Sequence, residues 1–307
     1  MLKSVYIGAS IAISWAWGTS LIMGMQIAQT KGTEAFLVWA TANCLTLTFF
    51  GILYKTEILT EKILEYKIVK WLLTIIQAFC LIVQLKILND ICSIPFGSEY
   101  SYFIVSAIGL LFVGIMYWRG LEASIFTDNF QGAITLLALM TLLGLCFYEG
   151  QTITVLPSSD SSSLIWAGWS ACILMSGIIS DLQHWQRAKV NGNGYAFEWA
   201  TGFFAFYLSL VYLLAHYQLS LTGSWLLFIA VLGVTTSTID SIAVAMHRSF
   251  GVNLGTLICF AICILWGIFI KVGILDLWSN FGVVRVLLAV TMLYLGMRHL
   301  AQKYFNK

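Results

Sequence analysis

Charged residues are scarce in this chain. Only 10% of its 307 residues are Asp, Glu, Lys or Arg, while 60% are hydrophobic. A chain of this composition cannot present a polar surface to water on every side, which excludes a soluble globular protein and predicts an integral membrane protein. The net charge of +2 also excludes the broad basic surface of a nucleic-acid-binding protein. We therefore expect the lipid bilayer, and no nucleic acid, among the partners.

Histidine and cysteine are few, and neither forms a metal-binding or disulfide pattern. The four histidines lie scattered near the ends of apolar runs, at His184, His216, His247 and His299. Most of the seven cysteines stand singly inside apolar segments, where cysteine behaves as a small hydrophobe. A membrane-embedded enzyme would need a nucleophile, a base or a metal cluster, and none is visible. We expect a protein that is not an enzyme.

Proline is rarer still, and this leaves room for long helices. The two prolines, Pro95 and Pro157, are expected in connections, and the clearest linker is S-S-D-S-S-S at 158–163. Windows of about 20 apolar residues, enough to cross a hydrocarbon core of about 30 Å, recur along the rest of the chain. The sequence predicts an all-α polytopic protein with ten spans, at 4–29, 34–54, 68–89, 100–118, 128–148, 163–184, 196–216, 222–246, 252–272 and 279–300.

The distribution of Lys and Arg predicts the orientation. If the N-terminus is cytoplasmic, most basic residues, Arg187 included, fall on the inside, and only Lys31, Lys86 and Lys271 fall outside. Both termini are then cytoplasmic, and the chain is a multi-pass protein of the cell membrane. The linker at 151–162 separates residues 1–150 from 163–307, with five spans in each part. An odd number of spans in each half gives the halves opposite topologies, as in inverted-repeat transporters.

Such an architecture places its site near the bilayer midplane, where the first span of each repeat is interrupted. The first span gathers Ser14, Gly18, Thr19 and Ser20 in its middle, and the sixth contains M-S-G-I-I-S-D at 175–181. Small residues in membrane helices also serve close helix packing, which is the alternative for any one glycine. The matched position in both halves favours a site, so we expect spans one and six to be broken.

The stretch T-T-S-T-I-D at 235–240 is the most polar segment inside an apolar run. Hydroxyls and carboxylates are the oxygen ligands that hard cations prefer. Ser and Thr can instead bond to the carbonyl four residues earlier, which explains one hydroxyl more easily than four. Acids inside a membrane are costly and normally face a partner or a cavity. Asp240 is therefore a candidate for the site, whereas Asp128 lies close enough to a span end to reach the interface.

Four segments resemble the sodium/solute symporter family. Y-W-R-G-L-E-A-S-I-F-T-D-N-F-Q at 117–131 is similar to that family's Y-x-G-G-L-x-A-V-x-W-T-D-x-x-Q, and S-T-I-D-S at 237–241 is similar to S-T-A-D-S. W-Q-R-A at 185–188 and I-G-A-S at 7–10 also match in order and spacing. The resemblance covers about residues 4 to 300. It implies a LeuT-type fold, a 5+5 inverted repeat, in a minimal ten-helix member.

The resemblance implies Na⁺-coupled symport of a small organic solute by alternating access, with Na⁺ as coupling ion and no organic cofactor. The implied ion ligands are main-chain oxygens of Ile13, Ala16 and Val234 and side-chain oxygens of Ser237 and Thr238. Asp128 matches an acid near the family's sodium path, and Asp240 is assigned to coupling. Family members often place a polar residue where this chain has Trp15. Substrate contacts are therefore argued locally, without assigning a sugar-like or proline-like solute.

The expected substrate contacts lie on the first, third and sixth spans: Trp15, Trp17, Thr19, Gln77, Ser176, Ser180, Asp181 and Gln183. A carboxylate at a midplane break indicates a solute with an amine or several hydroxyls, while tryptophans can stack on a ring or a cation. Asp181 can equally cap a half-helix or pair with His184. Trp118 and Trp278 are expected as interfacial anchors. A transport-deficient receptor, sensor or assembly partner is the alternative function, and the sequence leaves a homo-oligomer open.

Overall fold

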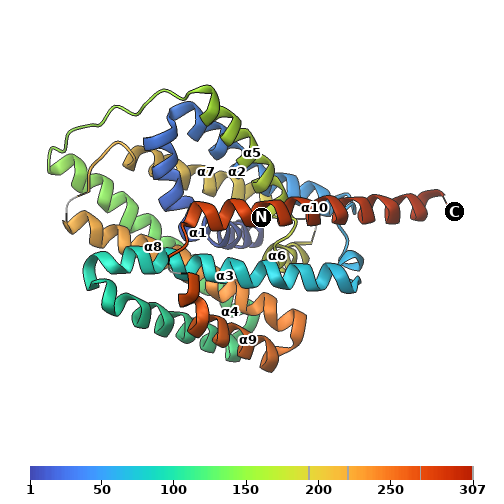
Figure 1. Cartoon of the computed structure of the whole chain (residues 1–307). Helices are drawn as coiled ribbons and strands as arrows, with labels where there is room; N and C mark the ends of the chain where they lie inside the picture. Colours follow the sequence, from blue (N-terminus) through green and yellow to red (C-terminus); the bar gives the residue numbers. More distant parts are fainter. Residues whose placement is uncertain (193, 220, 270, 306–307) are drawn as a thin grey trace.

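In the computed structural model the chain is all-α, and the description covers residues 1–192, 194–219, 221–269 and 271–305. The helices form one elongated bundle (Figure 1). The described elements are α1 (Leu2–Lys31), α2 (Thr33–Lys55), η1 (Glu61–Glu65), α3 (Lys67–Phe96), α4 (Ser98–Tyr148), α5 (Ser161–Gly177), α6 (Leu182–Asn191), α7 (Ala196–Leu214), α8 (Leu221–Phe250), α9 (Val252–Leu265), η2 (Trp266–Phe269) and α10 (Ile274–Phe305).

The helices are long and apolar enough for a multi-pass membrane protein. Eight of those described could each cross a membrane, and the number is nine if α5 and the bent α6 form one span. The sequence predicted ten, and the difference lies in α4, whose 51 residues contain the predicted spans 100–118 and 128–148 as two helical arms on either side of a kink. At 1.5 Å per residue these 51 residues would measure about 77 Å if the helix were straight, more than twice the thickness of a hydrocarbon core. Gly120, with φ 67° and ψ −158°, interrupts it.

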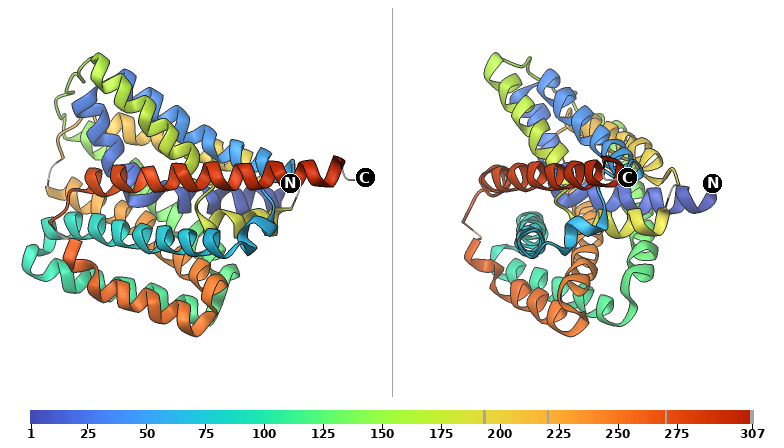
Figure 2. Two further views of the ribbon diagram at one scale, coloured as in Figure 1. Left: turned by 45° about the vertical axis from the view of Figure 1, so that its right-hand side comes forward. Right: turned by 90° about the vertical axis from the view of Figure 1, so that its right-hand side faces the viewer.

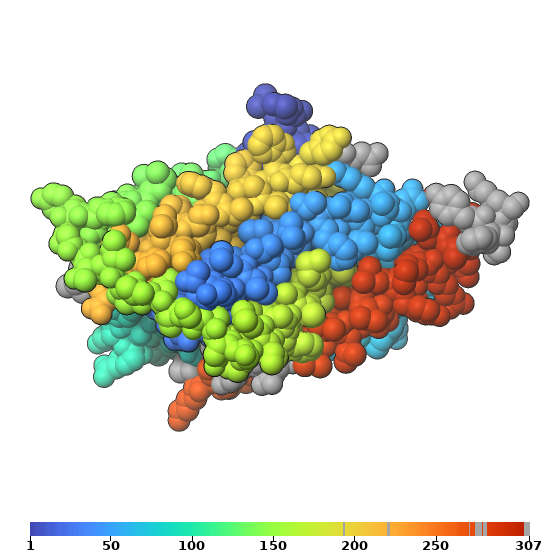
Figure 3. All heavy atoms as spheres, turned by 90° about the horizontal axis from the view of Figure 1, so that it is seen from above, coloured from blue at the N-terminus to red at the C-terminus, as the bar shows by residue number. Residues whose placement is uncertain are grey.

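The two predicted interruptions are present. In α1 the helix is broken at Trp17, whose φ of 36° and ψ of 148° are non-helical. The predicted sixth span consists of α5 and α6, which meet at an angle of 55° across residues 178–181. Of the candidate spans, α8 and α1 have the most buried apolar windows. In the face seen in Figure 3, α2, α5, α7 and α10 form the surface, and α1 is visible mainly where its start projects.

Some predicted boundaries are wrong. Pro95 lies in the last turn of α3 and not in a connection. A proline lacks the amide that continues the helix and clashes with the preceding turn, and α3 ends one residue later. The ninth span ends as the 3₁₀ helix η2. The linker is non-helical over residues 151–160, and α5 begins at Ser161, where the Asp160 side chain accepts a hydrogen bond from the Ser163 amide.

Ion pairs gather at one end of the bundle. Lys55 at the end of α2 pairs with Glu198 at the start of α7, at 2.5 Å. Glu61 in η1 pairs with Lys189 of α6 and Arg248 of α8. The start of α1 and the end of α10 also lie at this end, whereas the 151–160 linker lies at the other (Figure 2). The two termini therefore share one side of the bundle.

Candidate functional site

The break in α1 has a specific partner on α3. A non-helical residue frees backbone groups that must find other hydrogen-bond partners. The amide of Gly18 donates to Oε1 of Gln84 at 3.1 Å. A Cβ at Gly18 would lie 2.5 Å from the methyl of Thr235 and 2.9 Å from Ile87, so only glycine lets α8 and α3 pack this closely against the break. The break is therefore held between α3 and α8.

The break between α5 and α6 is organised by Asp181. Its side chain caps α6 by accepting from the Gln183 amide. Its two oxygens also accept from Gln77 Nε2 at 3.0 Å and from Gln183 Nε2 at 2.6 Å. His184 Nε2 lies 3.6 Å from the same carboxylate. The capping alternative is thus present in the structure, and Asp181 has little hydrogen-bonding capacity left for a solute.

The four hydroxyls of T-T-S-T at 235–238, in α8, have different hydrogen-bond partners. Thr235 and Thr236 bond to carbonyls of their own helix, at 2.6 Å to Val231 and Leu232 respectively. Ser237 instead donates to Asp128 Oδ1 on α4 at 2.7 Å. Thr238 lies 3.0 Å from the Val234 carbonyl and 3.4 Å from the Ser14 carbonyl of α1. The predicted ligand Thr238 therefore reaches the first span at Ser14, which is one residue from Ile13 and two residues from Ala16 along the chain.

Asp128 lies at the centre of a buried polar cluster. Arg187 Nη2 lies 2.5 Å from Asp128 Oδ2, and both side chains are fully buried. Ser10 donates to the same carboxylate, and Arg187 also donates to Ser241 at 2.7 Å. Two sequence-based expectations are corrected here: Arg187 is not a cytoplasmic surface charge, and Asp128 does not reach the interface. Helix α6 bends into the bundle after the break, and this carries Arg187 to α4.

Asp240 lies beside this cluster. It accepts hydrogen bonds from Ser124 at 3.0 Å, from Thr127 at 2.7 Å and from its neighbour Ser241 at 3.2 Å. Ser124 and Ser241 connect it to Arg187. Two carboxylates and one guanidinium therefore share one buried site between α4, α6 and α8, and the site has a surplus of negative charge when both acids are ionised.

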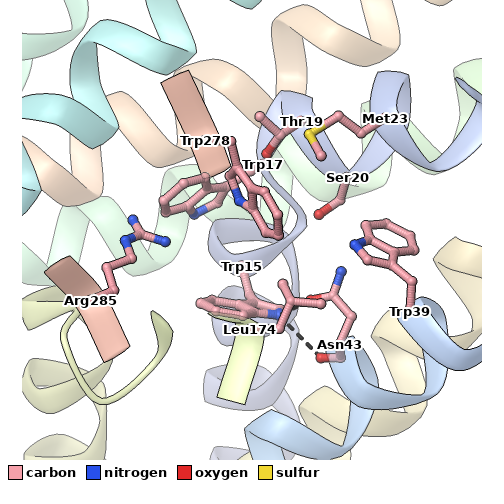
Figure 4. A pocket seen from close by; sticks show the side chains of 10 residues that line it. All are labelled: Trp15, Trp17, Thr19, Ser20, Met23, Trp39, Asn43, Leu174, Trp278 and Arg285. Carbon is pink, nitrogen blue, oxygen red and sulfur yellow. Dashed lines mark hydrogen bonds between the residues drawn. The ribbon is translucent and has the colours of Figure 1, made fainter. Parts of the chain in front are cut away.

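A small pocket lies at the two breaks (Figure 4). Its volume is about 20 Å³. The edge of Trp15 on α1 meets the ring of His184 on α6, with centroids 5.3 Å apart, which places the two breaks side by side. The side chains lining the pocket are those of Trp15, Trp17, Thr19, Ser20, Met23, Trp39, Asn43, Leu174, Trp278 and Arg285.

Three of the eight expected substrate contacts line this pocket: Trp15, Trp17 and Thr19. Gln77, Asp181 and Gln183 form their own hydrogen-bonded group next to it. Ser176 and Ser180 bond to carbonyls of α5, at 2.8 Å to Ile173 and 2.9 Å to Gly177. The role of these residues toward a solute stays a prediction, and the two serines are satisfied by the helix end itself.

The sequence did not assign the other seven lining residues to the pocket, and four of them bear on its chemistry. Trp278 is buried in the pocket and is not the expected interfacial anchor, whereas Trp118 is 81% exposed as an anchor should be. Asn43 accepts from Trp15 Nε1 at 2.8 Å, and Trp39 stands beside it (Figure 4). Arg285 lies over the face of Trp17 at 4.8 Å. An arginine inside an apolar span indicates function by default, so Arg285 carried a signal that the sequence reading left unused.

A second cavity opens on the other side of α1. It has a volume of about 220 Å³ and lies between α1, α4 and α7. Ile13, Ala16 and Asp128 line it, together with Tyr207 and mainly apolar side chains. The predicted main-chain ligands of the first span and the acid of the α4 cluster thus border one space.

Protein-family models and curated proteins were both compared with the chain, and neither comparison finds a match.

Proposed function

We propose that the protein is a secondary active transporter that couples the symport of a small organic solute to Na⁺. The pairing of two interrupted helices around a small pocket lined by buried side chains carries this proposal. Broken helices at membrane depth are tolerated where they line a cavity, and in transporters they supply the substrate and ion sites. We further propose that each arm of α4 is one span and that α5 and α6 together form one span, which gives ten spans. These ten would be arranged as a LeuT-type 5+5 inverted repeat.

The proposed ion site lies between α1 and α8. Thr238, within reach of the Ser14 and Val234 carbonyls, joins the two helices at this point. The Ser237 hydroxyl donates its hydrogen bond to Asp128, which leaves the lone pairs of the Ser237 oxygen for a cation. Ile13 and Ala16, just before the break, would contribute main-chain oxygens. A hard cation prefers such a set of oxygens.

Charge supports a cation at this place. Asp128 and Asp240 together outnumber Arg187 by one charge when both are ionised, and all three side chains are buried. A charge surplus inside a membrane protein is costly unless a counter-ion compensates it. Na⁺ bound here would hold α1 against α8 and shift the population toward one of the two access states.

Thermal unfolding of the full chain in detergent tests the ion site. Chloride concentration and ionic strength are kept constant while Na⁺ is exchanged for K⁺ or choline. We expect a saturable rise of the unfolding midpoint with Na⁺ alone, and its loss when Ser237→Ala and Thr238→Ala are combined. The matched control combines Ser209→Ala and Thr291→Ala, whose hydroxyls bond to their own helices at exposed positions.

Equal midpoints in Na⁺ and K⁺ would exclude the sodium site, and a response to acid alone would assign the coupling to H⁺. Transport is tested separately in proteoliposomes, with and without a Na⁺ gradient, using solutes that stabilise the protein in the presence of Na⁺. Binding without uptake would favour the receptor, sensor or assembly partner over the carrier.

A further inference from the structure

We infer that the pocket at the two breaks binds an anionic group, either the carboxylate of a small organic acid or an inorganic monoanion. This inference rests on the proposed function, since it names the substrate class of the same site. It departs from the amine or polyol that Asp181 suggested in the sequence. The inference is argued from the side chains that line the pocket and from the buried hydrogen-bond donors among them that have no partner in the described part of the chain.

Three buried N–H donors line the pocket without a hydrogen-bond partner among the described residues. They are Nε1 of Trp17, Nε1 of Trp39 and Nδ2 of Asn43, on side chains that are 5%, 2% and 1% exposed. The orientation of the Asn43 amide is set by Trp15, whose Nε1 donates to Asn43 Oδ1 at 2.8 Å. Its NH₂ group is therefore turned toward the pocket (Figure 4). Buried donors are normally paired, so these three indicate that a ligand supplies the acceptors.

Arg285 adds a positive charge to the same pocket. Its side chain is 6% exposed, and no carboxylate of the described residues lies within 4.0 Å of it. Its Nη2 lies 2.6 Å from the Cys80 sulfur, and its guanidinium lies over the face of Trp17. Thiol sulfur is a weak acceptor, and arginine has five donors in a fork that matches a carboxylate. A buried guanidinium with such partners favours an anion beside it.

Apart from its indole faces, one of which Arg285 already covers, the pocket offers little to a cation or an amine. None of its described lining residues is acidic, and the carbonyl of Asn43 is already occupied by Trp15. Asp181 is close enough to interact electrostatically with Arg285, but its oxygens are taken by Gln77, Gln183 and the first turn of α6. Thr19 and Ser20 can donate as well as accept. Donors and positive charge therefore dominate, and an ammonium group would be repelled.

The size of the pocket and the side chains that line it further limit the ligands that it can bind. A volume of about 20 Å³ admits one water molecule or one small anionic group. The walls are otherwise indole rings, Met23 and Leu174, which favour a weakly hydrated anion or a carboxylate on an apolar body. A Cβ at Gly177 would lie 3.4 Å from both Trp15 and Arg285. The glycine at the end of α5 therefore lets both side chains pack closely against the backbone.

The test measures the unfolding midpoint of the full chain at constant Na⁺, with sulfate replaced stepwise by thiocyanate, bromide, acetate or benzoate. We expect a saturable stabilisation by at least one of these monoanions. In Arg285→Gln the half-saturating concentration should rise by at least about tenfold, because a charge-assisted hydrogen bond is lost. Arg298→Gln, an exposed arginine on the same helix, is the matched control and should respond as the parent does.

Two further variants keep the test decisive if Arg285→Gln does not fold. Arg285→Lys preserves the charge and should bind, more weakly, while Trp39→Phe preserves the ring and removes one donor, so it too should bind more weakly. Stabilisation by thiocyanate or bromide alone would assign an inorganic anion, and stabilisation by acetate or benzoate would assign a carboxylate. An unchanged anion response in both Arg285→Gln and Trp39→Phe, or saturable stabilisation by ethylammonium or glycerol instead, would overturn the inference.

The outcomes separate this inference from the proposed coupling. An anion response that persists in K⁺, without any effect of Na⁺, keeps the anion site and contradicts Na⁺ coupling. A Na⁺ response without an anion response contradicts only the anion site.

Discussion

At the scale of residues, neighbours in one sequence stretch have different partners. In T-T-S-T-I-D, successive side chains of α8 turn by about 100° around the helix axis. Thr235 therefore bonds within α8, and Thr236 donates within α8 while it accepts from Gln131 on α4. Ser237 reaches Asp128 on α4, and Thr238 reaches α1. The sequence marked the whole stretch as unusual, and the helix geometry assigns each hydroxyl its partner.

The Asp128–Arg187 pair gives the clearest prediction at this scale. Asp128→Asn leaves a fully buried guanidinium without its counter-charge, so we expect a loss of about 3–5 kcal/mol in the free energy of unfolding. The double variant Asp128→Asn with Arg187→Gln should lose less than the sum of the single variants, because the two side chains interact directly. Equilibrium unfolding in mixed detergent measures these values.

Lys55→Gln is the control for that comparison. Lys55 and Glu198 are paired at 2.5 Å, but their side chains are 24% and 34% exposed. A pair that is partly solvated contributes about 0–1 kcal/mol. Additive losses for Asp128 and Arg187, or losses as small as that of Lys55, would contradict a cluster held by its charges.

At the scale of elements, single residues decide where helices break. Gly120 has a backbone conformation that side chains with a Cβ avoid, and a Cβ there would meet no described atom within 4 Å. Strain, and not crowding, is therefore the reason for glycine at the turn between the two arms of α4. The same element contains Gly144, which is helical and equally uncrowded.

We predict that Gly120→Ala lowers the free energy of unfolding by about 1–3 kcal/mol, the cost of holding a non-glycine residue in such a conformation. Gly144→Ala should leave stability unchanged or raise it by up to about 1 kcal/mol, since alanine restricts the unfolded chain and favours the helix. Both variants are compared by thermal unfolding. A neutral Gly120→Ala would show that α4 does not need the left-handed residue.

The start of α5 gives a prediction of pH dependence. Hydrogen bonds from Ser163 hold the pKa of the exposed Asp160 carboxyl below its usual value. A carboxyl with a lowered pKa in the folded state stabilises the protein above its ordinary pKa, and this contribution is lost as the pH falls through the lowered pKa. Between about pH 6 and about pH 3 the parent should lose more of its thermal stability than Asp160→Asn. Asparagine caps a helix without titrating, so equal losses would mean that the charge of Asp160 contributes nothing.

At the scale of the whole molecule, the two ends of the bundle differ in charge and in connections. Ion pairs join η1, α6 and α8 at the end that holds the termini, and the non-helical linker crosses the other. Lys62 and Lys303 are exposed at the first end and Ser158 at the second. The excess of basic residues predicts that the first end is cytoplasmic.

Cysteine labelling in intact cells tests that orientation. A membrane-impermeant maleimide should label Ser158→Cys from outside, and should reach Lys62→Cys and Lys303→Cys only after permeabilisation. The parent chain with its native cysteines gives the background. Labelling of all three positions from one side would contradict the multi-pass arrangement, whereas a fully reversed pattern would contradict the orientation alone.

Composition and periodic polarity sufficed for the membrane class, for most spans and for both helix breaks. These features depend on local properties: the length of an apolar run, and small polar residues in its middle. The sequence did not show that the two predicted spans within α4 meet at a kink at Gly120, because a single glycine has no distinct composition. Pro95 was misplaced because a proline in the last turn and one in a loop look alike in the sequence.

The sequence by itself determined that the chain is apolar, helical and interrupted in two of its predicted spans. Only the tertiary structure decided which polar residues meet there, because those contacts join residues far apart along the chain. Arg187 was expected at the surface and lies against Asp128, and Trp278 was expected at the interface and lies in the pocket. Arg285 likewise meets Trp17 only when α10 packs against α3 and α5. The local pattern predicted where the helices break, and long-range packing brought together the side chains that surround the breaks.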